Sequence, residues 1–191
     1  MAMAQVQPRL LSIGDYLELE ACSPQRQEYL AGYCYAMTGG SQAHNLVTVN
    51  LTFRLRQHLG VGACRVFSSD MKVFIESLQT FYYPDLAVSC APETRSPYFI
   101  ESPCLVAEVL SPGTERQDRN EKRDHYRQLG SLREFVLVDP RCRWAQVDRR
   151  SQTGGWETEL LSGSQTLRLT SVDLALPLDW IYEGLESPED S

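Results

Sequence analysis

The stretch that decides the fold is Cys104-Leu105-Val106-Ala107-Glu108-Val109-Leu110. A short, nearly continuous apolar run of this kind is typical of a β-strand that is buried on both faces of its sheet. Glu108 stands inside the run, although an unpaired buried carboxylate is strongly disfavoured relative to water. A lone buried glutamate is most often held by a salt bridge to an arginine or a lysine. A raised pKa or a bound metal ion would also accommodate the carboxylate.

A second carboxylate precedes a neighbouring apolar stretch. In the run Phe81-Tyr82-Tyr83-Pro84-Asp85-Leu86-Ala87-Val88, Asp85 stands at the start of another apolar strand. Asp85 and Glu108 on adjacent central strands could both reach one divalent cation. Hard oxygen ligands in small number suit Mg²⁺ or Mn²⁺.

A helix is predicted after the Glu108 strand, from Thr114 to about Leu129, with Gly130 as its stop. Thr114 and Gln117 have the spacing of a capping box. The 4, 4 and 3 spacing of Asp118, Lys122, Tyr126 and Leu129 places them on one face, which should pack on the sheet. Lys122 should therefore point towards the two carboxylates. Its plain alternative is a surface ion pair with Asp118. Two carboxylates and a lysine form the minimal set for hydrolysing a phosphodiester with a metal ion.

The other segments complete an α/β pattern. Ser12 is the expected N-cap of a helix over residues 13–20. Residues 44–59 fit both a strand alternation and a helical repeat, and their length and the Gly60 stop favour a helix. Further strands are expected at 65–67, 71–75, 134–139, 144–149 and 156–161, and two more within 26–37 around a turn at Ala31-Gly32. We predict one domain over residues 1–191, with its core at about 10–182 and an acidic tail at 183–191.

The net charge of −7 is unevenly distributed. Residues 1–150 hold 17 basic and 17 acidic residues, so the excess lies entirely in residues 151–191. Ten of the 18 basic residues fall between Glu115 and Arg150. A local basic surface for nucleic acid is compatible with this pattern, although charge alone is more typical of a solvated, mixed-charge surface.

Cysteines and hydropathy bear on the compartment. No apolar stretch approaches the roughly 20 residues of a membrane span. Residues 1–9 lack the features of a secretory signal. The six cysteines contain no C-x-x-C pair, which argues against a cysteine-based zinc site, and inside strands they fit reduced thiols. We predict a cytoplasmic protein with no membrane association.

The ordered motifs resemble the PD-(D/E)XK nuclease superfamily, and more closely the Uma-type family of restriction endonuclease-like proteins. The resemblance spans about residues 10–182. The matching stretches are Glu28-Tyr29-Leu30-Ala31-Gly32, Met37 through His44, Ser69-Asp70-Met71-Lys72-Val73, Tyr83-Pro84-Asp85, Glu108-Val109-Leu110-Ser111-Pro112, Asp118 to Lys122 with Tyr126, and Phe135 to Asp139. It implies a restriction endonuclease-like α/β fold, with a mixed central β-sheet flanked by helices and additional antiparallel strands. It also implies a helix at 44–59.

The resemblance assigns roles to four residues. Asp85 and Glu108 would hold the metal ion, and Glu28 matches a further acidic residue of the superfamily. Leu110 stands where the superfamily lysine would be, which is a departure. In this family the lysine lies on the following helix, which here is Lys122.

Three residues keep open alternatives. His44 could be a ligand or a general base, although such a histidine is more often a capping or core-edge hydrogen bonder. Asp70 fits a nearby acid or a turn residue, and Lys72 fits a residue leaning towards the site or a solvated strand lysine.

The resulting interpretation is a homodimeric, Mg²⁺-dependent DNA endonuclease in which Asp85, Glu108, Lys122 and Glu28 form the catalytic site. One alternative is a catalytically weak or inactive protein that binds nucleic acid or a protein partner, because a fold does not fix a function. Another is a metal-dependent hydrolase of a small phosphate compound.

Overall fold

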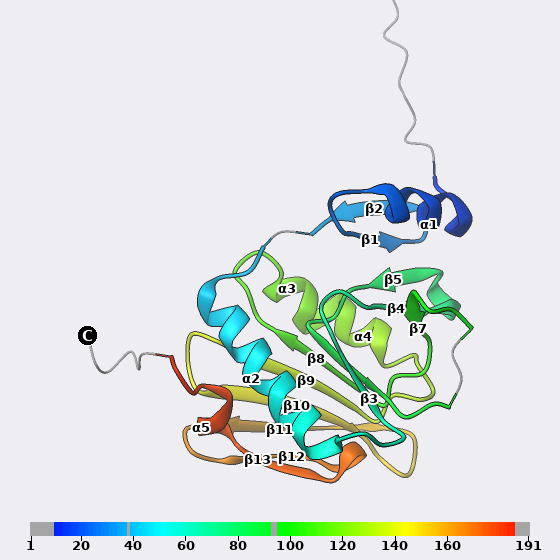
Figure 1. Cartoon of the computed structure of the whole chain (residues 1–191). Coiled ribbons are helices and arrows are strands. Elements are labelled where there is room, and N and C mark those ends of the chain that lie inside the picture. Colours follow the sequence, from blue (N-terminus) through cyan, green and yellow to red (C-terminus); the bar gives the residue numbers. More distant parts are fainter. Residues whose placement is uncertain (1–9, 38, 93–94, 186–191) are drawn as a thin grey trace, which may run out of the picture.

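The chain folds around a six-stranded sheet with apolar inner strands. The structure is a computed structural model, in which residues 10–37, 39–92 and 95–185 are described. The strand order is β11-β10-β9-β8-β6-β3, where β3 is Arg65–Ser68, β6 Leu86–Ser89, β8 Leu105–Val109, β9 Glu134–Asp139, β10 Trp144–Arg150 and β11 Trp156–Ser162. β8 and β9 run parallel and the other neighbours antiparallel, so the sheet is mixed as predicted (Figure 1).

A second sheet packs beside the end of the first that carries the candidate site. Its order is β2-β1-β5-β4-β7, where β1 is Gln27–Leu30, β2 Tyr33–Ala36, β4 Lys72–Ile75, β5 Thr80–Tyr82 and β7 Phe99–Ile100. The predicted turn joins β1 to β2, and both Ala31 and Gly32 adopt positive φ there. A two-stranded sheet pairs β12, Thr166–Leu169, with β13, Leu174–Pro177. The sequence did not predict β7, β12 or β13, nor β5 as a strand separate from β6.

Two of the predicted helices form close to their expected bounds. α1 spans Ile13–Cys22, and Ser12 and Asp15 cap it reciprocally. α2 spans Gln42–Leu59, which confirms the helix at 44–59. The shorter helical elements are η1 Glu76–Leu78, η3 Thr170–Val172 and α5 Leu178–Ile181.

The helix predicted from Thr114 to Leu129 is irregular. It consists of α3, Glu115–Gln117, a π-helical turn over Asp118–Lys122, and α4, Arg123–Tyr126. The predicted capping box is wrong: the Thr114 hydroxyl donates to Asp118 Oδ2 at 2.7 Å instead. We refer to residues 115–126 as the α3–α4 helix.

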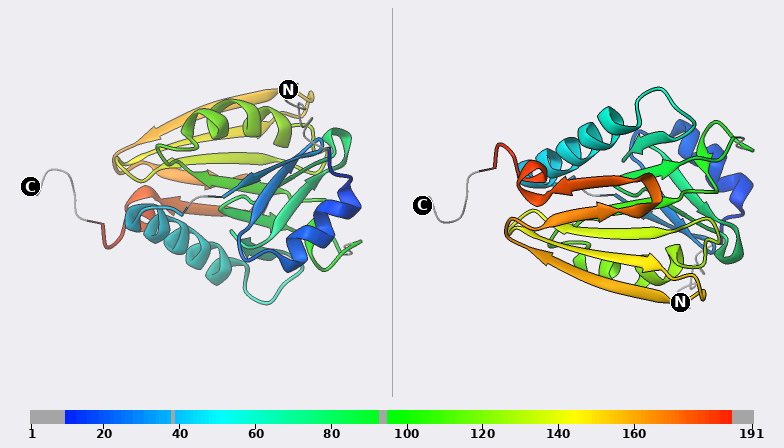
Figure 2. Two further views of the ribbon diagram at one scale, coloured as in Figure 1. Left: turned by 90° about the horizontal axis from the view of Figure 1, so that it is seen from above. Right: turned by 90° about the horizontal axis from the view of Figure 1, so that it is seen from below.

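The two faces of the six-stranded sheet are covered by different helices. On one face, Val47, Leu51 and Leu55 of α2 pack on alternate residues of β8, which are Leu105, Ala107 and Val109. On the other face, Tyr126 packs with Val106 and Leu110. Figure 2 shows α2 and the α3–α4 helix on opposite sides of this sheet. Because side chains alternate along a strand, Glu108 must share the face of Val106 and Leu110, under the α3–α4 helix.

The cysteines, the membrane prediction and the two ends of the chain have different outcomes. Cys64 and Cys90 form a disulfide in the structure, so the expectation of reduced thiols is wrong for this pair, while Cys22, Cys34, Cys104 and Cys142 are free. Within the described ranges, no helix has the length and apolar character to cross a membrane. The N-terminal stretch 1–9 and residues 186–191 of the acidic tail lie outside the described residues.

Candidate active site

The first feature of the site is a reciprocal contact between Asp85 and β8. Asp85 lies directly before β6, which neighbours β8 in the sheet. Its backbone N–H donates to Glu108 Oε2 at 3.2 Å, and its own Oδ2 accepts from the Val109 N–H at 2.7 Å. The two acidic side chains are thus held at the same end of two paired strands, as the metal-site interpretation requires.

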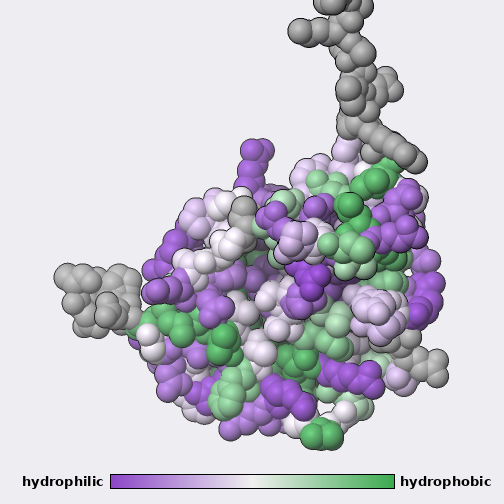
Figure 3. All heavy atoms as spheres, turned by 45° about the horizontal axis from the view of Figure 1, so that its top comes forward, coloured by the Kyte–Doolittle hydropathy of each residue, from purple (hydrophilic) through white to green (hydrophobic). Residues whose placement is uncertain are grey.

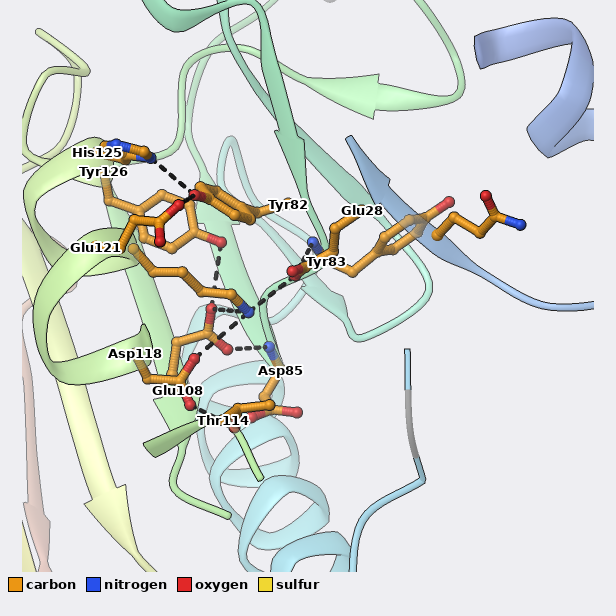
Figure 4. Close-up of polar contacts among 12 residues, drawn as sticks. Glu28, Tyr82, Tyr83, Asp85, Glu108, Thr114, Asp118, Glu121, His125 and Tyr126 are labelled. Carbon is orange, nitrogen blue, oxygen red and sulfur yellow. Dashed lines mark hydrogen bonds and ion pairs between the residues drawn. The ribbon is translucent and has the colours of Figure 1, made fainter. Parts of the chain in front are cut away.

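The second feature is a buried lysine among carboxylates. Lys122 points inward as predicted, and its side chain is only 6% exposed. Its Nζ lies 2.8 Å from Glu28 Oε1, 3.4 Å from Glu108 Oε1 and 3.5 Å from Asp118 Oδ1. Figure 4 shows these three carboxylates converging from β1, β8 and the α3–α4 helix. The ion pair with Asp118 does exist, but it is buried and belongs to this cluster.

The π-helical turn presents both Asp118 and Lys122 to the sheet. Asp118 and Lys122, four positions apart, are both buried, and so is Tyr126, four positions further on. A π-helical turn places one more residue in a turn than an α-helix does, and such turns are frequent at functional sites. Residues four positions apart also share a face in a regular helix, and here the three side chains keep that face through the wider turn.

Three tyrosines, Tyr126 on α4 and Tyr82 and Tyr83 at the end of β5, contact the cluster or the α3–α4 helix. Tyr126 Oη donates to Glu108 Oε1 at 3.3 Å, and the Tyr83 N–H donates to Glu28 Oε1 at 3.3 Å. Tyr82 Oη lies 2.7 Å from His125 Nδ1. These contacts fix the glutamate oxygens around Lys122.

His44 is the residue that sequence reasoning undervalued. It stands in the first turn of α2, where its N–H donates to Ser41 Oγ, and its ring Nε2 lies 3.2 Å from Asp85 Oδ2. The pKa of His44 is raised, mainly by this hydrogen bond to Asp85, although partial burial acts against it. A Cβ on Gly40 would lie 2.7 Å from His44 Nδ1, so a glycine is needed there. The Gly39-Gly40-Ser41 break before His44 was the available signal.

The electrostatics of the site are unbalanced. Burial, followed by the neighbouring carboxylates, raises the pKa of Glu108 well above its usual range, with Lys122 acting in the opposite direction. Burial lowers the pKa of Lys122, but Glu108, Glu28 and Asp118 outweigh that effect and raise it. Lys122 therefore stays charged. Lys122 and His44, which contacts Asp85, face four carboxyl groups, and the raised pKa of Glu108 reflects this excess of carboxyl groups.

The residues present fit a divalent cation. Asp85 and Glu108 offer hard oxygen donors, and among the described residues Asp118 Oδ1 is buried without a hydrogen-bond partner, with only the Lys122 ammonium near it. Within the described part of the chain, no three His, Cys, Asp or Glu side chains are already grouped as a metal site. With few protein ligands, a cation here would keep water in its coordination shell, as Mg²⁺ commonly does.

Three other residues singled out from the sequence lie elsewhere. Asp70 is exposed and pairs with Arg26 at 2.8 Å. Lys72 is buried rather than solvated, with its ammonium 5.4 Å from the centre of the Tyr83 ring and 6.0 Å from that of Tyr16. Leu110 is fully buried in the apolar core.

The family model described as "Putative restriction endonuclease", Uma2, matches residues 13–181. The chain belongs to the Uma2 family. Two proteins of Synechocystis sp. (strain ATCC 27184 / PCC 6803 / Kazusa) are similar. "Uncharacterized protein slr1290" is 37% identical over 92% of this chain and 93% of that protein. "Uncharacterized protein sll1609" is 32% identical over 70% of this chain and 77% of that protein.

The fold of this Uma2 protein also matches a solved structure. A crystal structure of a "putative nuclease belonging to DUF820" from Anabaena variabilis ATCC 29413 superimposes with a TM-score of 0.73 at 17% identity. The match covers 90% of this chain and 97% of that one. It supports the restriction endonuclease-like fold expected from the sequence.

Proposed function

We propose that this Uma2-family protein is a DNA endonuclease that uses Mg²⁺ or Mn²⁺ to hydrolyse phosphodiester bonds. The observation that carries the proposal is the buried Lys122 ammonium among Glu28, Glu108 and Asp118, beside Asp85. A structural ion pair needs one carboxylate for one lysine. The surplus of carboxylates is the feature that calls for a cation.

In this proposal each side chain has a separate role. Asp85 and Glu108 would hold the metal ion, which supplies an activated water and stabilises charge on the phosphoryl oxygen. Glu28 holds Lys122 in place through their 2.8 Å contact. Lys122 presents its positive charge to the oxygen that gains negative charge as the phosphorus–oxygen bond breaks. His44, on α2, holds the Asp85 carboxylate in place through its ring Nε2.

The test is cleavage of supercoiled plasmid DNA by wild type and by Asp85→Asn, with Mg²⁺, with Mn²⁺ and with EDTA. We expect nicking or linearisation by wild type only with a metal ion. Asp85→Asn should lose at least about 10²-fold of the rate, because one of two metal ligands becomes neutral. Equal cleavage by the two proteins would refute the assignment of Asp85.

A second candidate function is binding without catalysis. It is favoured by the same Lys122, because its ammonium already supplies positive charge to three carboxylates. Calorimetric titration with Mn²⁺ separates the two. Heat from one site in wild type that is absent in Asp85→Asn supports the enzyme, whereas no binding in either protein supports the binding module.

We also propose a homodimer, which would place two such sites on the two strands of a duplex. Its support is a stripe of partly exposed apolar residues on α2, formed by Leu46, Val49 and Phe53. Cytoplasmic localisation likewise remains a proposal.

A further inference from the structure

The edge strand β2 presents two tyrosines on the face that carries Glu28. In the β1–β2 pair, Tyr35 lies directly opposite Glu28, and Tyr33 lies opposite Leu30. Residues directly opposite each other in an antiparallel pair project from the same face of the sheet. Tyr33 and Tyr35 are 47% and 52% exposed, respectively. The same face therefore carries an anchor of Lys122 and, next to it, two open aromatic rings.

A cavity of about 770 Å³ lies between this hairpin and the α3–α4 helix. Leu30 and Tyr35 line one side, and Arg116, Gln117 and Asn120 line the other. Gln117 directly precedes Asp118 in the chain, so the cavity adjoins the catalytic cluster. Figure 3 shows hydrophilic residues around the recess beside the hairpin. We call this cavity the Tyr35 cleft.

Most of the basic residues that could bind nucleic acid are already paired. Of the ten between Glu115 and Arg150, seven form ion pairs with carboxylates: Arg119, Lys122, Arg123, Arg127, Arg141, Arg143 and Arg149. Arg150 donates to backbone carbonyls. Within the described residues, the side chains of Arg116 and Arg133 have neither kind of partner, and Arg116 lies at the Tyr35 cleft.

We propose that the Tyr35 cleft binds single-stranded DNA, with one base stacked on Tyr35 in the cleft, the next on Tyr33 beside it on the same face of β2, and a phosphate held by Arg116. An aromatic ring can stack only on a base whose face is open, and the faces are covered in a duplex. Two rings and the Arg116 guanidinium make a site that relies on stacking more than on charge. Glu121 also faces the cleft, which weakens attraction for a densely charged duplex.

This inference rests on the proposed function, because it names the form of DNA that reaches the catalytic cluster. Binding of single-stranded DNA can nevertheless be tested separately from cleavage. Binding to Tyr33 and Tyr35 requires neither the metal ion nor turnover.

The experiment measures fluorescence anisotropy of a labelled 12-nucleotide oligothymidylate and of a duplex of equal length, in EDTA so that no cleavage occurs. The variants are Tyr35→Ala, Tyr35→Phe and the double variant Tyr33→Ala/Tyr35→Ala. The matched control is Tyr98→Ala, because Tyr98 is 73% exposed and lines a different cavity, near Lys72. Thermal melting confirms that each variant is folded.

We expect wild type to bind the single strand more tightly than the duplex. Tyr35→Ala should weaken single-strand binding roughly 5- to 150-fold, the range for losing one base–aromatic stack. Tyr35→Phe should retain binding because its ring still stacks, and Tyr98→Ala should match wild type. The affinity should fall only shallowly with salt, since few phosphates are neutralised.

The outcomes separate this inference from the nuclease proposal. Metal-dependent cleavage combined with single-strand binding unchanged in folded Tyr35→Ala would overturn the stacking site and leave the nuclease standing. Tyr35-dependent binding without cleavage would support the stacking site and refute the nuclease. Tighter binding to the duplex, or no binding to either DNA, would also overturn the inference.

Discussion

Asp148 and the carboxylate cluster around Lys122 both contact side chains of the α3–α4 helix, and their charges are arranged in opposite ways. Asp148 of β10 is fully buried. Its Oδ2 lies 2.5 Å from Arg123 Nε and 3.0 Å from Arg127 Nη2, and its Oδ1 accepts a hydrogen bond from the Thr158 hydroxyl at 2.6 Å. Burial alone would raise the pKa of Asp148, yet these partners lower it. Glu108 has one lysine and several carboxylates around it, and its pKa is raised.

The difference separates a carboxylate whose charge is balanced by its neighbours from one whose charge is not. Two arginines contact the one carboxylate of Asp148, so its negative charge is neutralised without any additional group. Glu108 shares a single lysine with Glu28 and Asp118, so its negative charge is not. In the proposed function, a divalent cation supplies the missing positive charge.

The largest expected effect is on stability, on replacing Asp148. Asp148→Asn should lower the free energy of unfolding at pH 7 by about 3–5 kcal/mol, because two arginines lose their buried partner. A carboxyl whose folded pKa is lowered contributes stability above its unfolded pKa and loses it as the pH falls through the folded value. The gap between variant and wild type should therefore narrow below about pH 4.

Urea unfolding at pH 7 and at about pH 3.5 measures this gap. The refolded variant should bind Mn²⁺ like wild type, since Asp148 does not touch the cluster. A variant as stable as wild type at pH 7 would mean that the arginines, and not Asp148, set the structure of this region.

The next effect is on activity. Lys122→Met should lower Mg²⁺-dependent cleavage of plasmid DNA by about 10²-fold or more, the scale for losing one oriented charged group. Cleavage at the wild-type rate would end the assignment of Lys122. Because the variant leaves Glu28 and Glu108 without their cation, it should also be less stable, and more so at pH 8 than at pH 5, where the carboxyls take up protons. Melting curves at the two pH values test this.

The smallest effect is predicted for Glu108→Gln. A carboxyl whose folded pKa is raised destabilises the fold as the pH rises from its unfolded pKa, about 4.3, towards the folded value. The amide removes that penalty. Metal-free Glu108→Gln should melt at the wild-type temperature or a few degrees higher, a gain of up to about 1 kcal/mol, while Mn²⁺ binding is abolished. A large loss of stability would instead indicate an ordinary buried ion pair with Lys122.

The sequence predicted the parts of the site that depend on periodicity. A charged residue in an apolar strand, a Pro-Asp before the neighbouring strand and a lysine at helical spacing all follow from side-chain alternation and pitch. The resemblance to a family added Glu28, which lies on the other sheet and has no local signal.

Other parts depend on tertiary packing and were not predictable. The place of His44 against Asp85 depends on where α2 meets the end of β6, and that contact links residues far apart in the chain. The Thr114–Gln117 spacing predicted a cap, but the hydroxyl found a partner in Asp118. Lys72 is buried beside the rings of Tyr16 on α1 and of Tyr83, which directly follows β5, and a strand pattern alone does not indicate this.

The π-helical turn at Asp118–Lys122 lies in the helix that carries the lysine. It closes on the fifth residue instead of the fourth, so it holds one residue more than a regular turn. The extra residue is absorbed within the turn, and the helix continues beyond it with the same face towards β8. An insertion or deletion elsewhere in the α3–α4 helix has no such turn to absorb it and would rotate everything beyond it by roughly 100°. Lys122 or Tyr126 would then leave the face that carries Asp118, so this helix should tolerate substitutions far better than changes of length.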